Sequence, residues 1–327
     1  MEKSAPRQIN YLRISITDRC NLRCVYCTYW KEWQKRPAAE ILRYEELLRL
    51  AAMAAEAGIR KIRITGGEPL VRRGLVGFLQ ELKRLPGIDQ VCLTTNGVLL
   101  RELAPDLYNA GVRHLNVSLD TLKRDRYHRI TGSDNLPAVM AGLRQAASLG
   151  FHPLKINCVV LRGINDDEVL DIARLARETP LQVRFIELMP MTSQTWWQRH
   201  FLSMAEVRRR LAVLGPLEPL IREATAGPAR NFRVTGFQGE LGFISPMSEH
   251  HCPTCNRLRL SSDGKIRPCL LGSQELDLKG PLRQGVSDDF LGYLFQEAIQ
   301  FKNRKTGHSL ANDVLILRDL PMVSIGG

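Results

Sequence analysis

Six of the eight cysteines in this 327-residue chain lie in two short clusters. The first is CNLRCVYC, in which Cys20, Cys24 and Cys27 have the spacing C-x3-C-x2-C. Three thiolates this close can hold three corners of a 4Fe-4S cubane, and no histidine precedes His114 to supply a fourth ligand. One iron is then left open, as in metal centres that bind and transform a substrate. The spacing predicts a catalytic iron-sulfur site, with zinc completed by Asp18 or water as the alternative.

The second cluster is Cys252-x2-Cys255-x13-Cys269, again without a fourth cysteine. His250 and His251 adjoin it and could complete a zinc ribbon, so this spacing leaves zinc and an iron-sulfur centre equally open. In either case the intervening loop must fold back to bring Cys269 to the pair. Clustered cysteines in a chain without a secretion signal indicate metal binding rather than disulfides.

Charge and composition limit the kinds of binding partner and the classes of protein to be expected. The chain has 46 Lys and Arg against 34 Asp and Glu, a formal charge of +12, which favours nucleic acid, nucleotide phosphates or an anionic membrane face. Hydrophobic residues at 44% and charged residues at 24% exclude intrinsic disorder and a collagen-like chain. No apolar run approaches the length of a membrane span, and MEKSAPRQ at the start has no apolar core for a signal peptide. We therefore expect a soluble cytoplasmic protein.

Short strand-like runs alternate with helical patterns along the first two thirds of the chain. The expected strands are 11–16, 61–65, 90–94, 114–118, 154–161 and 182–188. The expected helices include 44–57, a stripe that ends before Gly150 and a stripe that begins after Asp167. Six such units predict an α/β fold with a parallel sheet, arranged as a partial (β/α)6 barrel whose ligands bind at the carboxyl ends of the strands.

The pattern changes after about residue 215. Residues 216–230 read as a loop with three prolines, 231–262 as short strands, and 275–284 and 287–304 as helices. We expect residues 1–215 to form the barrel core and 216–327 to form a C-terminal extension that carries the second cluster.

Several basic residues lie inside the expected strands. Arg63, Lys155 and Arg184 would be costly there unless each is paired or faces a cavity. Arg257 and Arg259 are two apart, so they share one face of a strand. Such charges, if they converge, would form a pocket for a polyanion such as a triphosphate. Alternatively, these basic residues lie at solvated ends of the sheet or form structural ion pairs.

The first cysteine cluster is followed by Gly66-Gly67-Glu68-Pro69, and this combination resembles the radical S-adenosylmethionine superfamily. Together with LTTNG, NVSLD, RFIELMP, CPTCNRLRLSSDGK and the terminal Gly326-Gly327, it resembles the GTP 3′,8-cyclase family of molybdenum cofactor biosynthesis from Leu12 to the last residue. The resemblance implies two 4Fe-4S clusters, with Cys20, Cys24 and Cys27 holding the first and Cys252, Cys255 and Cys269 the second. It implies that S-adenosylmethionine yields a 5′-deoxyadenosyl radical that takes hydrogen from ribose C3′ of GTP. The C3′ radical then attacks guanine C8, and reduction gives 3′,8-cyclo-7,8-dihydro-GTP.

The resemblance also assigns residues. Those implied for S-adenosylmethionine are Tyr26, Gly66, Gly67, Glu68, Ser118 and Met189. Those implied for GTP are Arg13, Lys61, Arg63, Thr94, Lys155, Arg184, Arg257 and Arg259. No protein general base is expected, since the cofactor carries the hard step. Residues 28–34 and 191–200 depart from the family pattern, and the Gly326-Gly327 tail is expected to thread into the active site.

The expected partners are GTP and an external one-electron donor of the reduced flavodoxin or ferredoxin type, without nucleic acid or membrane, and a homodimer is compatible with the sequence. Two rival functions remain. One is a radical S-adenosylmethionine enzyme acting on another nucleotide or a peptide. The other is a zinc-ribbon protein that binds nucleic acid through its positive charge, although its basic residues are scattered through strands rather than gathered in a run.

Overall fold

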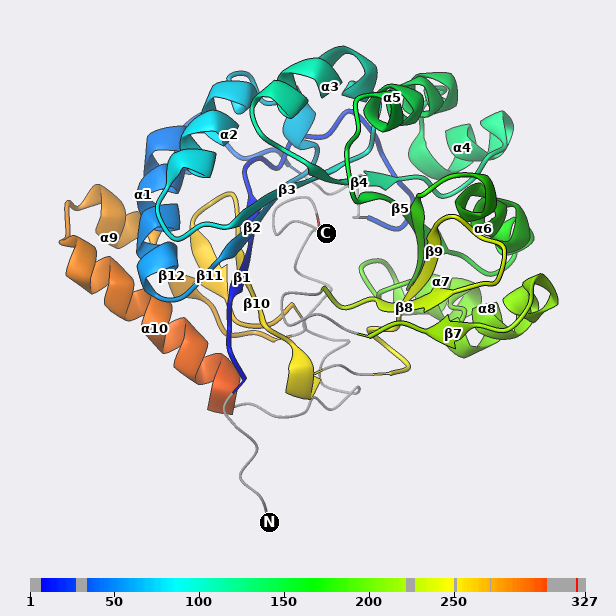
Figure 1. Cartoon of the computed structure of the whole chain (residues 1–327). Coiled ribbons are helices and arrows are strands. Elements are labelled where there is room, and N and C mark those ends of the chain that lie inside the picture. The colour runs from blue at the N-terminus through cyan, green and yellow to red at the C-terminus, as the bar shows by residue number, and fades with distance from the viewer. Residues whose placement is uncertain are drawn as a thin grey trace. The chain divides into compact units, whose positions relative to one another are not determined.

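The computed structural model describes residues 7–27, 34–221, 227–249, 252–270, 272–304 and 322. The chain forms two compact units. Their helices and strands are labelled in Figure 1. Unit 1 contains residues 1–20, 33–92 and 251–327, and unit 2 contains residues 21–32 and 93–250. Strand β3 (Gln90–Thr95) belongs to unit 1 up to Cys92 and to unit 2 from Leu93.

Unit 1 joins strands from both ends of the sequence. Its strands run in the order β12-β11-β10-β1-β2-β3, with β10 and β2 parallel to β1, and with β11 antiparallel to β10 and to β12. Its further elements are β1 (Tyr11–Ser15), η1 (Ala38–Glu40), α1 (Tyr44–Glu56), β2 (Lys61–Thr65), η2 (Pro69–Val71), α2 (Leu75–Arg84), η4 (Cys252–Thr254), β10 (Arg257–Leu260), β11 (Lys265–Arg267), β12 (Leu276–Asp277), α9 (Lys279–Arg283) and α10 (Asp288–Arg304).

Unit 2 has the order β4-β5-β6-β9-β8-β7, in which β4, β5, β6 and β9 are parallel and β8 and β7 turn back antiparallel. Its elements are α3 (Leu100–Asn109), β4 (His114–Ser118), α4 (Arg124–Thr131), α5 (Leu136–Ser148), β5 (Leu154–Val160), α6 (Val169–Glu178), β6 (Gln182–Glu187), α7 (Gln194–His200), α8 (Met204–Leu211), η3 (Ala212–Leu214), β7 (Glu218–Pro219), β8 (Arg230–Arg233) and β9 (Glu240–Ile244).

The alternating strands and helices confirm the predicted α/β class. The six predicted strands match β1 to β6 to within one residue at each end, because each is a short apolar or alternating run bounded by turn residues. On β1, Leu12 and Ile14 are fully buried on one face, while Tyr11 and Arg13 occupy the other. Each central strand therefore has an apolar face that packs into the core and a face that carries polar groups.

The helices cover the apolar faces by the same logic. On α1, Leu47, Leu50, Ala51 and Ala54 are fully buried, and Gly58 follows the helix with a φ of 100°. Helix α10 runs beside α1 in unit 1 (Figure 1). The predicted helix 287–304 is thus confirmed as α10.

The predicted helix 275–284 is wrong in its first half. Leu276 instead pairs with Ile266 in the short strand β12, and helix α9 starts only at Lys279. The Asp277 side chain accepts hydrogen bonds from the amides of Lys279 and Gly280, at 3.0 Å and 3.2 Å, and so defines the helix start. Within the predicted loop 216–230, residues 218 and 219 form strand β7, and residues 222–226 lie outside the described ranges.

No helix among the described residues has both the length and the apolar character needed to cross a membrane.

Candidate functional site

The loop after β2 contacts the segment that leads into Cys20, within unit 1. The amide of Gly67 donates to the carbonyl of Thr17 at 2.7 Å, and the amide of Glu68 donates to that of Arg19 at 2.8 Å. A Cβ on Gly67 would come within 2.3 Å of the Arg19 carbonyl oxygen, which no side chain tolerates. The two glycines are therefore required for this close backbone approach, and Glu68 is buried with its carboxylate accepting from the amide of Leu70.

The loop carrying Cys24 and Cys27 belongs to unit 2. Both cysteines are half-buried and not in disulfides, and the amides of Arg23 and Val25 donate to carbonyls at the end of α4. The hydroxyl of Tyr26 donates to the Asp120 carboxylate at 2.6 Å. That carboxylate also accepts from the amide of Val159 at 2.8 Å, so it ties the cysteine loop to strand β5.

Burial shifts the pKa values of both Asp120 and Tyr26. It raises the pKa of Asp120 to about 6, against the lowering effect of the hydrogen bonds from Tyr26 and Val159. Burial, and then the Asp120 carboxylate, raise the pKa of the Tyr26 phenol well above its ordinary value. Tyr26 is therefore a neutral hydrogen-bond donor at physiological pH.

The predicted basic residues of unit 1 form two rows across β10, β1 and β2. In one row Arg13 lies opposite Arg259 on one side and Arg63 on the other. In the second row, two residues away on the same face, Tyr11 lies between Arg257 and Lys61. The parallel pairing of β1 with β10 thus brings together residues almost 250 positions apart in the sequence.

Tyr11 links the two rows. Its hydroxyl accepts from Nε of Arg63 at 2.6 Å, and Nζ of Lys61 lies 5.2 Å from the centre of its ring. Burial lowers the pKa of Arg13 to about 10, and Arg63 and Arg257 lower it too, while Tyr11 partly offsets them. Burial, followed by Arg13 and Arg257, also lowers the pKa of Arg259 well below its ordinary value. The two rows concentrate positive charge on one face of the strands, and a bound polyanion would stabilise this charge.

Arg267 extends the first row onto β11, directly opposite Arg259. It is 6% exposed and forms an ion pair with Glu275. Among the described residues, its Nε and Nη1 atoms have no hydrogen-bond partner.

The predicted residues of unit 2 lie on or just after neighbouring parallel strands. Ser118 on β4 and Arg184 on β6 lie opposite Asn157 on β5, and Lys155 is two residues before Asn157, so all three predicted side chains share one face. Nε of Arg184 donates to the amide oxygen of Gln182 at 2.7 Å.

Room for Arg184 comes from β9. Its register partner there is Gly242, where a Cβ would approach Cγ of Arg184 to 3.0 Å. Thr94 lies on β3, and Met189 follows the end of β6.

The three cysteines of the second cluster are all in unit 1. Cys252 begins the single turn η4, and Cys255 precedes β10. The antiparallel pair β10 and β11 folds the chain back, so that Cys269 follows the strand beside Arg257 and Arg259. Burial raises the pKa of Cys252, and the neighbouring Cys269 and Cys255 raise it further, so Cys252 lies within electrostatic reach of the other two cysteines.

Two cations contact the middle cysteine of this cluster. Burial raises the pKa of Cys255, but Arg257 and then Lys302 outweigh it and lower the pKa to about 6. A thiolate is the ligand form of cysteine, so this donor set of three half-buried cysteines that are not in disulfides fits an iron-sulfur cluster. Among the described residues, no group of three or more His, Cys, Asp and Glu side chains is arranged to hold a single metal ion. His250, His251 and the Gly326-Gly327 tail lie outside the described residues.

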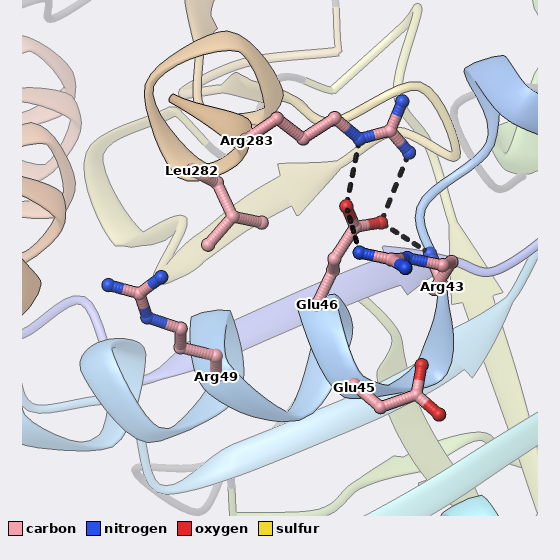
Figure 2. A pocket seen from close by; sticks show the side chains of 6 residues that line it. All are labelled: Arg43, Glu45, Glu46, Arg49, Leu282 and Arg283. Carbon is pink, nitrogen blue, oxygen red and sulfur yellow. Dashed lines mark hydrogen bonds and ion pairs between the residues drawn. The ribbon is translucent and has the colours of Figure 1, made fainter. Parts of the chain in front are cut away.

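Unit 1 also has a pocket beside α1 that contains none of the predicted site residues. It is lined by Arg43, Glu45, Glu46, Arg49, Leu282 and Arg283 (Figure 2). The guanidinium of Arg283 on α9 donates to the Glu46 carboxylate at 2.8 Å and 3.1 Å, and the amide of Arg43 donates to it at 2.7 Å. This pocket is a structural junction between α9 and the start of α1.

Four residues at these sites escaped prediction. Two-residue alternation from Arg13 along β1 would have pointed to Tyr11, whereas Arg267 shares the face of Arg259 only through the pairing of β11 with β10. Asp120 follows Ser118 within the motif NVSLD. Lys302 continues the apolar stripe Leu291, Phe295 and Ala298 of α10, where a charged residue is unusual.

Comparison with known proteins agrees with this arrangement. Residues 14–176 match the family described as "Radical SAM superfamily", and residues 181–309 match the family described as "Molybdenum Cofactor Synthesis C". The GTP 3′,8-cyclase of Moorella thermoacetica is 50% identical over 302 residues, covering 92% of this chain and 94% of the relative. That of Thermodesulfovibrio yellowstonii is 44% identical over 329 residues and covers the whole of both chains.

Among solved structures, Streptococcus suis SuiB bound to S-adenosylmethionine has the same fold. Its TM-score is 0.60 at 15% identity, over 88% of this chain and 68% of SuiB. The identity to the two cyclases over at least 92% of the chain decides the finer assignment: the chain belongs to the GTP 3′,8-cyclase family of the radical S-adenosylmethionine superfamily.

Proposed function

We propose that this chain is a GTP 3′,8-cyclase, which joins ribose C3′ of GTP to guanine C8 and produces 3′,8-cyclo-7,8-dihydro-GTP for molybdenum cofactor biosynthesis. The observation that carries this proposal is the pair of basic rows on β10, β1 and β2, directly beside the second cysteine cluster. The identity to named cyclases over nearly the whole chain supports it.

Cys20, Cys24 and Cys27 would hold the first cluster, and Tyr26, Gly66, Gly67, Glu68, Ser118 and Met189 would bind S-adenosylmethionine. When bound, the cluster and S-adenosylmethionine supply a 5′-deoxyadenosyl radical. The chain's own part is to bind and orient: Gly66 and Gly67 let the backbone approach closely, Glu68 contributes its carboxylate, and Tyr26 holds the cysteine loop against Asp120. Ser118 and Met189 complete the proposed set.

GTP is bound through its charge and its base. The guanidinium groups of Arg13, Arg63 and Arg259 are placed to bind the triphosphate, because the row offers several donors that repel one another until an anion arrives. Lys61 and Arg257 in the second row, with Thr94, Lys155 and Arg184, complete the proposed contacts. Cys252, Cys255 and Cys269 would hold the second cluster, which would supply an iron able to bind guanine.

The chain has two functional parts and depends on an external electron donor. Residues 1–215 form the part that generates the radical, and 216–327 form the extension with the second cluster. The electron donor is a one-electron reductant of the flavodoxin or ferredoxin type, the protein works in the cytoplasm, and a homodimer is compatible with the sequence.

Product analysis tests the activity. The chain is purified without oxygen, reconstituted, and incubated with GTP, S-adenosylmethionine and a reductant. We expect 5′-deoxyadenosine and a cyclised guanosine triphosphate in equal amounts, with C3′ deuterium of labelled GTP recovered in 5′-deoxyadenosine. Absence of 5′-deoxyadenosine, or deuterium recovered from another position, would contradict the proposal.

Metal analysis tests the cofactors. Two cubanes predict about eight irons per chain, falling to about four when either cysteine set is replaced by Ala. Replacing Cys92 and Cys158, which are buried in strands, is the matched control and should leave iron unchanged. Zinc at Cys252, Cys255 and Cys269 would retain radical chemistry but remove the guanine site, and zinc with salt-dependent nucleic-acid binding would favour the zinc-ribbon rival.

A further inference from the structure

The second cysteine cluster has a cation on its inner side that comes from a distant helix. Lys302, in the last turn of α10, is only 6% exposed. It takes the position that follows Leu291, Phe295 and Ala298 on the buried stripe of that helix. A buried lysine at a core position is costly unless its ammonium group has partners, so its contacts indicate what it does.

Those partners lie on the two chain segments that carry Cys255 and Cys269. Nζ of Lys302 donates to the carbonyl oxygen of Pro268, the residue before Cys269, at 2.5 Å. The same ammonium group forms a hydrogen bond with Cys255 and interacts electrostatically with Cys255 and Cys269. Lys302 therefore contacts both the segment that ends at Cys255 and the segment that leads into Cys269.

A second cation holds the third cysteine to the same helix. Nη1 of Arg7 donates to the carbonyl of Cys252, and its Nε donates to the side-chain oxygen of Asn303 at 3.1 Å. The last turn of α10 thus contacts the backbone beside Cys269 directly and the backbone of Cys252 through Arg7. The two side chains with the largest electrostatic effect on Cys255 are Arg257 and Lys302, both positive.

A buried positive charge beside an iron-sulfur cluster stabilises the reduced form, which carries one more negative charge, and so raises the reduction potential. We propose that Lys302 is a positioning residue of the second iron-sulfur cluster: it fixes the chain segment that carries Cys269 and raises the reduction potential of the cluster. This inference rests on the proposed function, because it requires a cluster at Cys252, Cys255 and Cys269.

The test uses the full chain with Cys20, Cys24 and Cys27 replaced by Ser, so that spectra report the second cluster alone. In this parent we compare Lys302→Met, which removes the charge, with Lys302→Arg, which keeps it, and Lys302→Gln, which keeps a donor without the charge. Arg304→Met is the matched control, because it removes a positive charge from the same helix turn at an exposed position. The readouts are the midpoint potential from an anaerobic redox titration and the rate of iron loss to a chelator.

We expect Lys302→Met and Lys302→Gln to have a more negative midpoint potential than the parent and Arg304→Met, and Lys302→Arg to return towards the parent. Iron should leave Lys302→Met roughly tenfold faster, as for a lost hydrogen bond to a charged group, and Lys302→Gln should lose it more slowly than Lys302→Met. An unchanged potential in Lys302→Gln, or an equal shift in Lys302→Arg, would overturn the inference. Zinc or no cluster in the parent would overturn the cluster assignment as well, which separates the two failures.

Discussion

At the scale of single residues, the arginine row is a site where substrate binding and stability oppose each other. Arg13, Arg63 and Arg259 lie side by side with their backbones in register, and burial and mutual repulsion lower the pKa of Arg259 and of Arg13. The row is costly in the free protein and becomes favourable when a triphosphate neutralises it.

Replacing Arg259 by Met should therefore separate binding from folding. We expect the thermal midpoint of the ligand-free protein to stay the same or rise, and GTP affinity to fall at least tenfold, since a hydrogen bond to a charged group contributes about 1.5–3 kcal/mol. The measurement is thermal unfolding with and without GTP. Arg233→Met, at an exposed strand position, is the control, and a GTP-induced shift that survives in Arg259→Met would refute the role of Arg259.

The bond between Tyr26 and Asp120 has a pH dependence whose sign follows from burial. The folded pKa of Asp120, about 6, lies above its ordinary 3.8, so the carboxyl favours folding at low pH and this contribution is lost as pH rises through 6. Above that pH the Tyr26 hydroxyl partly offsets the cost of the buried charge.

Tyr26→Phe should thus destabilise the protein by about 1–3 kcal/mol at pH 7 and by less at pH 5. Urea unfolding at the two pH values measures this difference. Tyr293→Phe, at a tyrosine that is 56% exposed, should change neither value. A loss in Tyr26→Phe that is equal at both pH values would show that Asp120 does not change its charge between pH 5 and pH 7.

At the scale of elements, the start of α1 depends on a carboxylate that α9 supports. Burial raises the pKa of Glu46, but hydrogen bonds from Arg283 and from the Arg43 amide outweigh it and lower the pKa to about 2 (Figure 2). Because the folded pKa lies below the ordinary 4.5, this stabilisation is present above pH 4.5 and is lost as pH falls towards 2.

We expect Glu46→Gln to lower the free energy of unfolding by about 2 kcal/mol at pH 7, a value discounted because Arg283 is partly exposed. The difference from the unmodified chain should shrink as pH falls from about 4.5 to about 2. Glu45→Gln, which alters the exposed neighbouring carboxylate, serves as the reference. A difference that persists undiminished at pH 2.5 would contradict the ion pair.

At the scale of the whole molecule, both units depend on strands from the second half of the sequence. Strand β10 pairs with β1 in unit 1, and β9 pairs with β6 in unit 2. A chain that ends at residue 215 lacks β9 and β10, and would expose the edges of two central apolar strands.

We therefore expect residues 1–215 alone to aggregate or to lack a cooperative unfolding transition, although they contain the radical S-adenosylmethionine motifs. Circular dichroism during heating, together with size-exclusion chromatography, measures this against the full chain. A soluble fragment with a sharp transition would show that the segment folds independently of the extension.

The amino-acid sequence by itself determined the features that depend on local order. The spacing of Cys20, Cys24 and Cys27 is read directly from the sequence. The six predicted strands and most helices follow from short-range periodicity, because side-chain period and turn residues act over a few positions. The exception, residues 275–284, shows the limit: strand pairing with Ile266 overrode a helical pattern.

The tertiary structure alone decided which charges meet. Only the pairing of β1 with β10 brings Arg13 beside Arg259, and only the packing of α10 brings Lys302 to Pro268, 34 residues earlier in the chain. Such contacts join segments whose closure entropy and mutual packing depend on the whole fold, so no local pattern contains them.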